Sequence, residues 1–343
     1  MDDTEAMTRV EIRRRGAGPG RTGTKSRMDP KKRKVLKWVA VGAAVIVLAL
    51  VGFAVAQYMS IGSKMQPPKQ ERARIQAVLD APPAQEKSPF VYVLLLGNDH
   101  HPGERWTRTD TILLARLDTR DKAVLMLSIP RDTYTEVRGH GLTKINGASS
   151  WGGVPLTIET VKRFTGLPVN HYVEIDFQGF QQVVDDLGGV DMYVSRPVNY
   201  GNGISVHAGQ QHLNGTEALE VMRNRHAYGD GDFARMNNQQ LFLKSIARKM
   251  AAPSSLVKLP GALNAVADHV QSDLSASDMI SLVRDYRVAD SSKVKSYTIP
   301  GQPKMIDKVS YIVPDMARAK ALFDAIRAGQ IPPASLGYRM GID

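Results

Sequence analysis

Cysteine is absent from this chain of 343 residues. Disulfide bonds, thiolate nucleophiles and zinc sites built from thiolates are therefore excluded, and a large core must supply the stability. The chain also lacks a Gly-x-Ser-x-Gly elbow, which argues against a serine hydrolase. No HExxH motif supports the adjacent His100 and His101 as ligands of a transition metal, and we expect them to lie in a loop. There is no internal repeat, and the length suits one large or two ordinary domains.

Acidic residues are scarce only at the N-terminus. The formal net charge is +11, and residues 1–37 hold 12 Lys and Arg against five acids, while the remainder holds 33 against 29. Such a tail is too short to read DNA, so the sequence predicts no nucleic acid partner. Its Gly, Arg, Ser and Thr content predicts a disordered segment held near anionic lipid.

A long uncharged run follows the tail. The 19 residues from Trp38 to Ala56 carry no charge and are long enough to cross a bilayer. Lysines and arginines crowd the N-terminal flank, and Trp38 and Tyr58 stand at positions typical of interfacial aromatics. The sequence therefore predicts an uncleaved signal anchor in the cell membrane, of single-pass type II, with the N-terminus cytoplasmic and the rest extracytoplasmic.

The pattern of apolar residues predicts five regions and an α/β fold. The regions are a cytoplasmic tail (1–37), a transmembrane helix (38–56), a Pro-containing stalk (57–88), a globular domain (89–330) and a C-terminal tail (331–343). Expected strands are 90–96, 111–117, 123–129, 171–175, 190–194 and 294–299. Expected helices are 71–79, 156–164, 177–187, 216–222, 233–250, one after Ser275, and 315–326. Their alternation predicts a central mixed sheet with helices on both faces.

Three charged residues are expected to meet at one edge of this sheet. The first three strands form a meander if 118–121 is a tight turn, which brings Asp99, Asp110 and Arg131 to the same edge. Two carboxylates facing a guanidinium suit a divalent cation that holds a phosphate. On spacing alone, a surface ion pair beside loop acids is an equally good interpretation.

A second group of arginines lies further along the chain. Arg223 and Arg225 are two residues apart, which on an extended segment places both on one side, and Gly229 and Gly231 favour such a segment. On the helix that follows, Asp232, Arg235 and Gln239 have spacings that share a face. Together with Arg131, these arginines outnumber nearby carboxylates and predict an anion site. For Arg235 alone, a solvated helix face explains the charge equally well.

Several ordered motifs resemble the LytR-CpsA-Psr family of envelope phosphotransferases. The resemblance covers roughly residues 89–330. Its motifs are Leu95-Leu96-Gly97-Asn98-Asp99, Arg108-Thr109-Asp110-Thr111, Ser128-Ile129-Pro130-Arg131-Asp132, Lys144-Ile145-Asn146, Val184-Asp185-Asp186-Leu187-Gly188-Gly189-Val190, Leu213-Asn214-Gly215, Arg223-Asn224-Arg225 and Asp232-Phe233-Ala234-Arg235 with Gln239-Gln240. The chain departs from the family at Asn98, where a small apolar residue is common, and at Asn238, where an arginine is frequent.

The resemblance implies an enzyme that moves a phospho-glycopolymer, such as a teichoic acid or capsular polysaccharide, from a polyprenyl-pyrophosphate carrier to peptidoglycan. By motif position, Asp99 and Asp110 would hold Mg²⁺, or Mn²⁺ in its place. Arg108, Arg131, Arg223, Arg225 and Arg235 would bind the pyrophosphate with help from Gln239, and Arg131, Asp110, Arg108 and Arg225 would act in catalysis. The lipid would need an apolar tunnel, with 156–164, 177–187 and 241–246 as candidate walls, although ordinary core explains each equally well.

Two other functions use the same residues. One is an anchored receptor or regulator that binds polyprenyl phosphate or anionic glycans without turnover, and the other is a lipid-pyrophosphate hydrolase. The general base is not identified by the resemblance, and Asp132 and Asp232 are the candidates.

Overall fold

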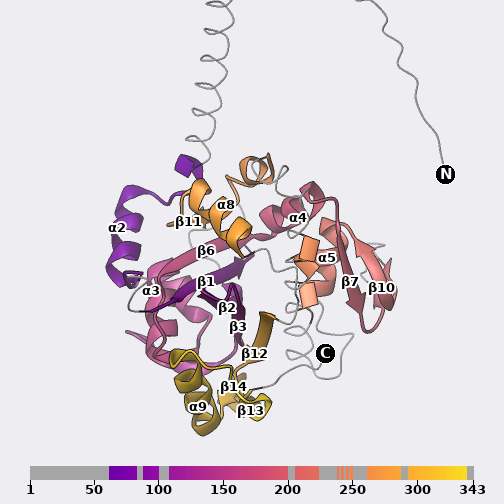
Figure 1. The fold of residues 1–343 in the computed structure, drawn as a ribbon. Helices are drawn as coiled ribbons and strands as arrows, with labels where there is room; N and C mark the ends of the chain where they lie inside the picture. Colours follow the sequence, from indigo (N-terminus) through magenta and orange to yellow (C-terminus); the bar gives the residue numbers. More distant parts are fainter. Residues whose placement is uncertain are drawn as a thin grey trace, which may run out of the picture. The chain divides into compact units, whose positions relative to one another are not determined.

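A six-stranded mixed sheet organises the computed structural model of this chain (Figure 1). The structure describes residues 62–82, 88–99, 108–199, 205–223, 261–286 and 293–337, with a few helical residues between 238 and 249. All of these belong to the unit formed by residues 56–343. The predicted membrane anchor, Trp38 to Ala56, lies outside the described residues, and no helix among the described ones is long and apolar enough to span a bilayer.

The strands of the central sheet follow the order β11-β6-β1-β2-β3-β12. Their bounds are Phe90–Asn98 (β1), Thr109–Asp118 (β2), Val124–Ile129 (β3), His171–Asp176 (β6), Val270–Ser272 (β11) and Val294–Thr298 (β12). β1, β2 and β3 pair antiparallel as a meander, β6 runs parallel to β1, and β12 runs parallel to β3. The mixed sheet predicted from the sequence is confirmed.

The turn between β2 and β3 has the chemistry that its sequence predicts. The carboxylate of Asp118 accepts hydrogen bonds from the backbone N–H groups of Arg120 (2.9 Å) and Asp121 (3.1 Å). An aspartate at the first position of a turn stabilises it in this way. Because the turn is tight, the end of β1, the start of β2 and the end of β3 meet at the opposite edge of the sheet.

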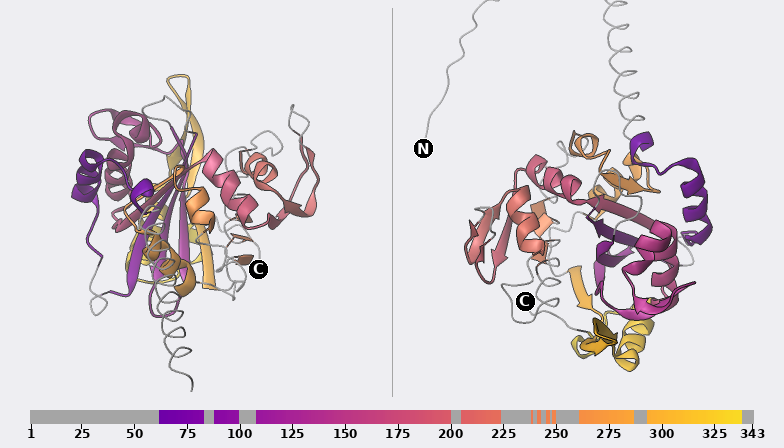
Figure 2. Two further views of the ribbon diagram at one scale, coloured as in Figure 1. Left: turned by 90° about the horizontal axis from the view of Figure 1, so that it is seen from above. Right: turned by 180° about the vertical axis from the view of Figure 1, so that it is seen from behind.

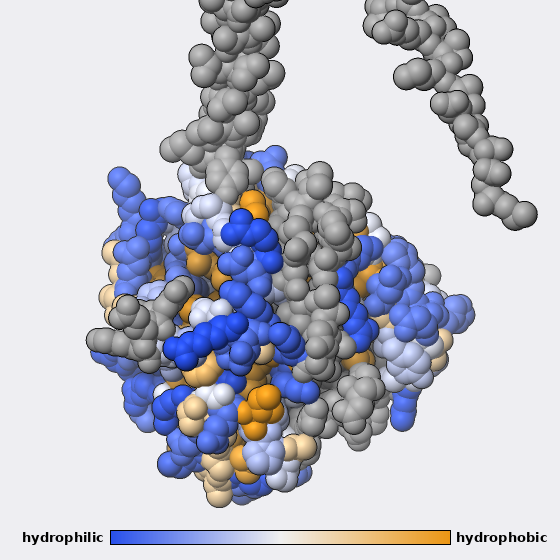
Figure 3. Space-filling model, in the orientation of Figure 1, coloured by the Kyte–Doolittle hydropathy of each residue, from blue (hydrophilic) through white to orange (hydrophobic). Residues whose placement is uncertain are grey.

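Helices cover both faces of the sheet, as Figure 2 shows in its left view. The helices are α2 (Lys69–Val78), α3 (Gly147–Thr165), α4 (Phe177–Asp186), α5 (Gly215–Arg223), α8 (Ala276–Asp285) and α9 (Met316–Arg327), and a 3-10 turn spans Ala334–Leu336. Side chains of α2, α3 and α9 form the main core with one face of the sheet. Side chains of α8 pack on the other face. On the side drawn in Figure 3, hydrophobic residues of the described surface lie in small separate spots.

Four hairpins lie outside the central sheet. They pair β4 (Tyr134–Val137) with β5 (Gly141–Lys144), β7 (Val190–Val194) with β10 (Gly209–Leu213), β8 (Val198–Asn199) with β9 (Ser205–Val206), and β13 (Gly301–Ile306) with β14 (Val309–Pro314). Of these strands only β7 is predicted by the sequence. Most of the others are short or rich in polar residues, so no apolar run marks them. β14 carries Val309, Tyr311, Ile312 and Val313, and this apolar run was missed in the prediction from sequence.

Two segments at the ends of the described chain pack onto the domain. Ile75 of α2 is buried in the main core, and Lys162 of α3 donates to the carbonyl of Val78 (2.7 Å) and to the carboxylate of Asp80 (2.8 Å). Leu336 packs against the same core. The helical part of the expected stalk is therefore attached to the domain by both apolar and charged contacts.

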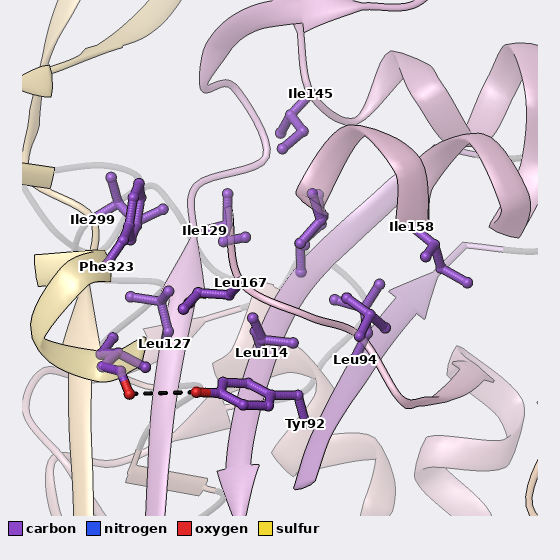
Figure 4. Packing of buried hydrophobic residues seen from close by; sticks show 14 of the residues in the cluster. Tyr92, Leu94, Leu114, Leu127, Ile129, Ile145, Ile158, Leu167, Ile299 and Phe323 are labelled. Carbon is purple, nitrogen blue, oxygen red and sulfur yellow. Dashed lines mark hydrogen bonds between the residues drawn. The ribbon is translucent and has the colours of Figure 1, made fainter. Parts of the chain in front are cut away.

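A buried arginine ties the sheet to α9. Arg116 of β2 donates to the carbonyl oxygens of Ile326 (2.7 Å) and Gln330 (3.2 Å), and its guanidinium lies 4.6 Å from the ring centroid of Phe90. Tyr92 donates its hydroxyl to the same carbonyl of Ile326 at 3.3 Å (Figure 4). The backbone N–H groups of Ala328 and Gly329 also donate to this carbonyl. Arg116 therefore reinforces the end of α9 and places a positive charge at the negative end of the helix.

Replacement of Arg116 by methionine is expected to destabilise the protein by about 1.5–3 kcal/mol, because the buried carbonyl of Ile326 and the partly buried carbonyl of Gln330 lose a charged donor. Chemical denaturation of the purified protein measures the change. The control is Arg120→Met, at an exposed position of the adjacent turn, which should stay within about 0.5 kcal/mol of wild type. Equal stability of the two variants would show that Arg116 does not hold α9 to the sheet.

Candidate functional site

We call the edge of the sheet where β1 ends, β2 begins and β3 ends the site edge. Asp110 occupies a β-bulge there. In the β1–β2 ladder, Gly97 pairs with Thr111 and Asn98 pairs with Thr109, so Asp110 is an extra residue on β2. Bulges twist the strand locally and re-aim a side chain, and they are frequent beside active sites. The carboxylate of Asp110 is 26% exposed and forms an ion pair with Arg131.

Arg131 follows β3 directly opposite Asp110. The β2–β3 register pairs Ile112 with Ile129, and its continuation places Arg131 across from Asp110. The guanidinium is 15% exposed, and its Nε lies 3.8 Å from Asp132. The backbone carbonyl of Arg131 accepts from the N–H of Asn146 (3.2 Å), which fixes the start of α3 beside it. The predicted meeting of Asp110 and Arg131 at one sheet edge is thus seen in the structure.

Asp99 and Arg223 bring a second acid and a second arginine together. Asp99 follows the end of β1, and its carboxylate lies 3.8 Å from Nη2 of Arg223. The guanidinium of Arg223 stands over the ring of Phe177, 4.5 Å from the centroid. Stacking on an aromatic face orients a guanidinium and leaves its in-plane donors available.

Antiparallel packing of α4 and α5 sets the place of Arg223. Gly215, at the start of α5, donates to the carboxylate of Asp185 near the end of α4 (2.7 Å) and lies so close to the backbone of Gln181 that a Cβ would clash. The start of α5 thus lies beside the end of α4, and the end of α5 lies beside Phe177 at the start of α4. Since α4 follows β6 immediately, Arg223 arrives at the edge where β1 and β6 end.

The remaining predicted arginines are placed only in part. Arg108 is exposed and directly precedes β2, one position from the Asn98–Thr109 pair. Arg225, Arg235 and Gln239 lie outside the described residues, as does Asp232. Arg223 is the last residue of α5, so the prediction that it lies on an extended segment is wrong. The helical pattern of 216–222 continues for one residue because its side chain can pack on Phe177.

Two residues that lie at the site were not predicted to have a role there. Lys144 of β5 donates to the carboxylate of Asp132 at 2.8 Å and lies over the ring of Tyr311, 5.7 Å from the centroid. Asp132 is therefore held between a lysine and Arg131, which suits a residue that orients Arg131 better than a free general base. Phe177, which supports Arg223, is the other contributor. The Lys-Ile-Asn motif was a signal for Lys144, whereas only the helix packing reveals Phe177.

The carboxylates of Asp99 and Asp110 suit a divalent cation that also binds a phosphate. Mg²⁺ is commonly held by one or two carboxylates, with substrate phosphates and water completing the octahedron. No group of three or more His, Asp or Glu that could hold a metal occurs among the described residues, so a cage built from protein alone is not seen there. Between the two acids, the buried Oδ1 of Asn98 and Oγ1 of Thr109 have no hydrogen-bond partner. Such unsatisfied oxygens suit a hydrated ion or a ligand.

Glu174 lies on the same face of the sheet as Asn98. Glu174 pairs with Leu96 in the β1–β6 ladder, two residues before the Asn98–Asp176 pair. Burial raises the pKa of Glu174 from 4.5 to about 7, while a hydrogen bond with Asn98 acts in the opposite direction, and Glu71 and Asp176 raise it further. Asn98, the departure from the family pattern, is therefore the polar partner of a carboxyl group beneath the site edge.

Glu174 should make stability fall as the pH rises. Because the folded pKa of about 7 exceeds the unfolded value of 4.5, its protonation favours the folded state below pH 4.5, and this contribution is lost as the pH rises toward 7. The carboxyl retains some solvent contact, so the loss is on the order of 2 kcal/mol. Thermal unfolding of wild type and Glu174→Gln across this range measures it. A pH dependence that is identical in the two proteins would contradict the assignment.

The candidate tunnel walls contain core residues. Ile158 and Val161 of α3 are fully buried in the main core. Val184 of α4 and Phe242 belong to a separate cluster with β7 and β10. These contacts account for the apolar side chains named here as packing between neighbouring elements.

The sequence of this chain is similar to those of known proteins. The family model described as "LytR_cpsA_psr family" matches residues 53–328. A Bacillus anthracis protein named polyisoprenyl-teichoic acid–peptidoglycan teichoic acid transferase TagU is 32% identical over 292 residues, which cover 84% of this chain and 95% of that protein. The protein of the same name from Bacillus licheniformis is 35% identical over 224 residues, which cover 65% of this chain and 72% of that protein.

Solved structures show the same fold. The crystal structure of B. subtilis TagV matches with a TM-score of 0.64 and 28% identity, covering 71% of this chain and 99% of that one. A structure titled "TagT bound to LIIa-WTA" matches with a TM-score of 0.62 and 27% identity, covering 73% of this chain and 94% of that one.

Proposed function

Because the chain belongs to the LytR-CpsA-Psr family, we propose that it transfers a phospho-glycopolymer from a polyprenyl-pyrophosphate carrier to peptidoglycan. The observation that supports this most directly is the pair of acid–arginine contacts at one sheet edge, Asp110 with Arg131 and Asp99 with Arg223. Alternating carboxylates and guanidiniums match a diphosphate that brings its own cation. The activity named for TagU, transfer of teichoic acid to peptidoglycan, needs such a site.

The proposed reaction is a displacement at the phosphorus next to the sugar. A peptidoglycan hydroxyl oxygen forms a bond to this phosphorus, and the bond to the oxygen that bridges the two phosphates breaks. The bridging oxygen leaves with the electron pair as part of polyprenyl phosphate, and the hydroxyl proton passes to a base or to solvent. The glycopolymer is then joined to peptidoglycan through a phosphodiester.

The residues of the site act mainly by position and charge. Arg131 and Arg223 donate hydrogen bonds to non-bridging phosphate oxygens, and Arg108, exposed at the mouth of the site, can reach them from the start of β2. Preorganised donors of this kind stabilise charge that develops on transferring phosphoryl groups. Asp132 and Lys144 hold Arg131 in place. Arg225, Arg235 and Gln239 are proposed to complete the pyrophosphate site by motif position, with Arg225 also assigned to catalysis.

Asp99 and Asp110 are the residues that would hold Mg²⁺, or Mn²⁺ in its place. A divalent cation held there would neutralise charge on the diphosphate. Asp110 pairs with Arg131 and Asp99 lies near Arg223, so the same carboxylates also orient the two guanidiniums that are proposed to bind the phosphates.

The chain is proposed to work at the outer face of the cell membrane. The uncharged run from Trp38 to Ala56, with its basic N-terminal flank, supports a type II anchor. A tethered domain would meet its lipid-linked donor at the bilayer surface and its acceptor in the wall.

Purified full-length protein in detergent tests the proposal when it is given a polyprenyl-pyrophosphate-linked glycan whose sugar-proximal phosphorus is labelled. With peptidoglycan present, the label should enter peptidoglycan as a phosphodiester, and polyprenyl phosphate should be released in equal amount. Sustained release of free sugar phosphate without peptidoglycan would favour the hydrolase instead. Tight lipid binding with no product under either condition would favour the receptor.

A further inference from the structure

Trp151 of α3 is a large aromatic side chain that stays open to solvent. It is 45% exposed, although the ring of His140 stacks on it with centroids 4.1 Å apart and planes 9° apart. Its six-membered ring also lies against Gly147, where a Cβ would come within 2.6 Å of Cζ3. The indole is therefore held on two sides and presents the rest of its surface outward.

The start of α3 lies between the indole ring of Trp151 and the site edge. The N–H of Asn146 donates to the carbonyl of Arg131, and Gly147, against which the ring packs, is the next residue. His140 lies between β4 and β5, the hairpin that follows Arg131 in the chain. Trp151 thus lies one helical turn after Gly147 and against the turn of the hairpin that follows Arg131, whereas Arg223 comes from α5, which packs with α4.

A break in α3 separates the Trp151 segment from the part of the helix that packs in the main core. Gly153 has φ 65 and ψ −155 inside the helix, and Pro155 follows it. The residues after the break are buried on the sheet, among them Ile158 and Val161. Since proline and a non-helical glycine interrupt the hydrogen-bond ladder, the first turns need not continue the direction of the part after the break. Ala148 is buried in these first turns, whereas Trp151 lies on their exposed side.

Charged residues of the β4–β5 hairpin and of α3, the elements that hold the ring, are in ion pairs. Arg138 pairs with Glu159 (2.9 Å), and Arg163 pairs with Glu136 (3.3 Å). Lys144 pairs with Asp132 (2.8 Å). A surface with matched charges gives little attraction to a polyanion such as a teichoic acid. It suits the weakly charged face of a sugar ring, whose C–H groups pack on an aromatic plane while its hydroxyls remain in water.

We infer that Trp151, supported by His140 and Gly147, binds a hexosamine ring of the peptidoglycan acceptor and so brings the attacking hydroxyl to the phosphate held by Arg131. The inference rests on the proposed function, because it assigns the acceptor of that reaction. The arginines then serve the anionic donor, and the balanced aromatic surface serves the glycan.

Binding is tested on the full-length protein with short peptidoglycan glycan chains that carry their stem peptides but no lipid. The emission of Trp151, isolated as the difference between wild type and Trp151→Phe, should shift when these chains are added. Poly(glycerol phosphate) should cause no shift. A shift with the anionic polymer and none with the glycan would overturn the assignment in favour of the donor polymer.

Kinetics test the same surface during transfer. Trp151→Ala should raise the acceptor KM about fivefold to tenfold and leave the donor KM and kcat near wild type, as expected for the loss of one aromatic stack. Trp151→Phe should recover part of the affinity, and Gly147→Ala, which displaces the ring without removing it, should resemble Trp151→Ala. The control is Tyr193→Ala, another exposed aromatic, on β7, which should change nothing.

The outcomes separate this inference from the proposed function. Normal transfer by wild type together with an unchanged acceptor KM in Trp151→Ala would remove the inference and leave the transferase intact. Glycan binding through Trp151 in a protein that never transfers would support the surface and remove the transferase. An equal rise of donor and acceptor KM in Trp151→Ala would show a general structural role and overturn the inference.

Discussion

Replacement of Asp110 by asparagine is expected to lower kcat for transfer by roughly 10²- to 10³-fold. Asparagine keeps the shape of the side chain, but it removes the charge that pairs with Arg131 and that would bind the cation. Because the residue sits in a bulge with no ladder partner, the sheet has little reason to rearrange. The release of polyprenyl phosphate, followed over time, measures the loss.

The matched control is Asp121→Asn, in the turn at the opposite edge of the same meander, which should keep normal activity. Donor binding by Asp110→Asn should survive at a reduced affinity, because the arginines remain. If the variant kept more than about a tenth of wild-type activity, Asp110 would be a member of a surface ion pair and nothing more, which is the other interpretation that the sequence allowed.

Replacement of Arg131 by lysine is expected to lower kcat/KM by about 10- to 100-fold, although the charge is kept. A guanidinium presents a planar fork to two phosphate oxygens, whereas an ammonium is a point donor on a flexible stem. In this structure the fork is also engaged by Asp110 and lies near Asp132. A lysine ammonium cannot pair with both Asp110 and Asp132 and also donate hydrogen bonds to two oxygens of a diphosphate.

Arg284→Lys on α8 is the control for this change, since its guanidinium is exposed and pairs with the neighbouring Asp285. It should leave kcat/KM unchanged. Wild-type kinetics for Arg131→Lys would mean that the residue contributes charge alone, and the geometric part of the account would fail.

Much of the sheet edge follows from local sequence. The runs from Phe90, Thr111 and Ala123, joined by a turn that Asp118 stabilises, predict the meander and therefore the meeting of Asp110 with Arg131. The residues that make these contacts are close in sequence. Their meeting depends only on the apolar pattern that marks each strand and on the residues that form the turn. The capping pair Ser275 and Asp278 likewise predicts the start of α8, and it is confirmed.

Other parts of the site depend on contacts that no local pattern encodes. The ring of Phe177 meets Arg223 because Gly215 allows α5 to approach α4 closely. The bulge at Asp110 is a shift in the pairing of β1 with β2. The alternation of inward and outward side chains along a strand does not reveal such a shift. The sequence predicts a helix only from Leu156, whereas α3 begins at Gly147 and continues through a kink at Gly153.

The most direct test of the account uses Mn²⁺ as a paramagnetic probe of a short polyprenyl diphosphate bound to the full-length protein. If Asp99 and Asp110 hold a cation against the diphosphate beside Arg131, Mn²⁺ should strongly broaden the ³¹P resonances of the bound ligand on wild type. The broadening should fall sharply on the Asp99→Asn, Asp110→Asn double variant at equal ligand occupancy. Equal broadening on both proteins, or a bound diphosphate that Mn²⁺ leaves sharp on wild type, would contradict it.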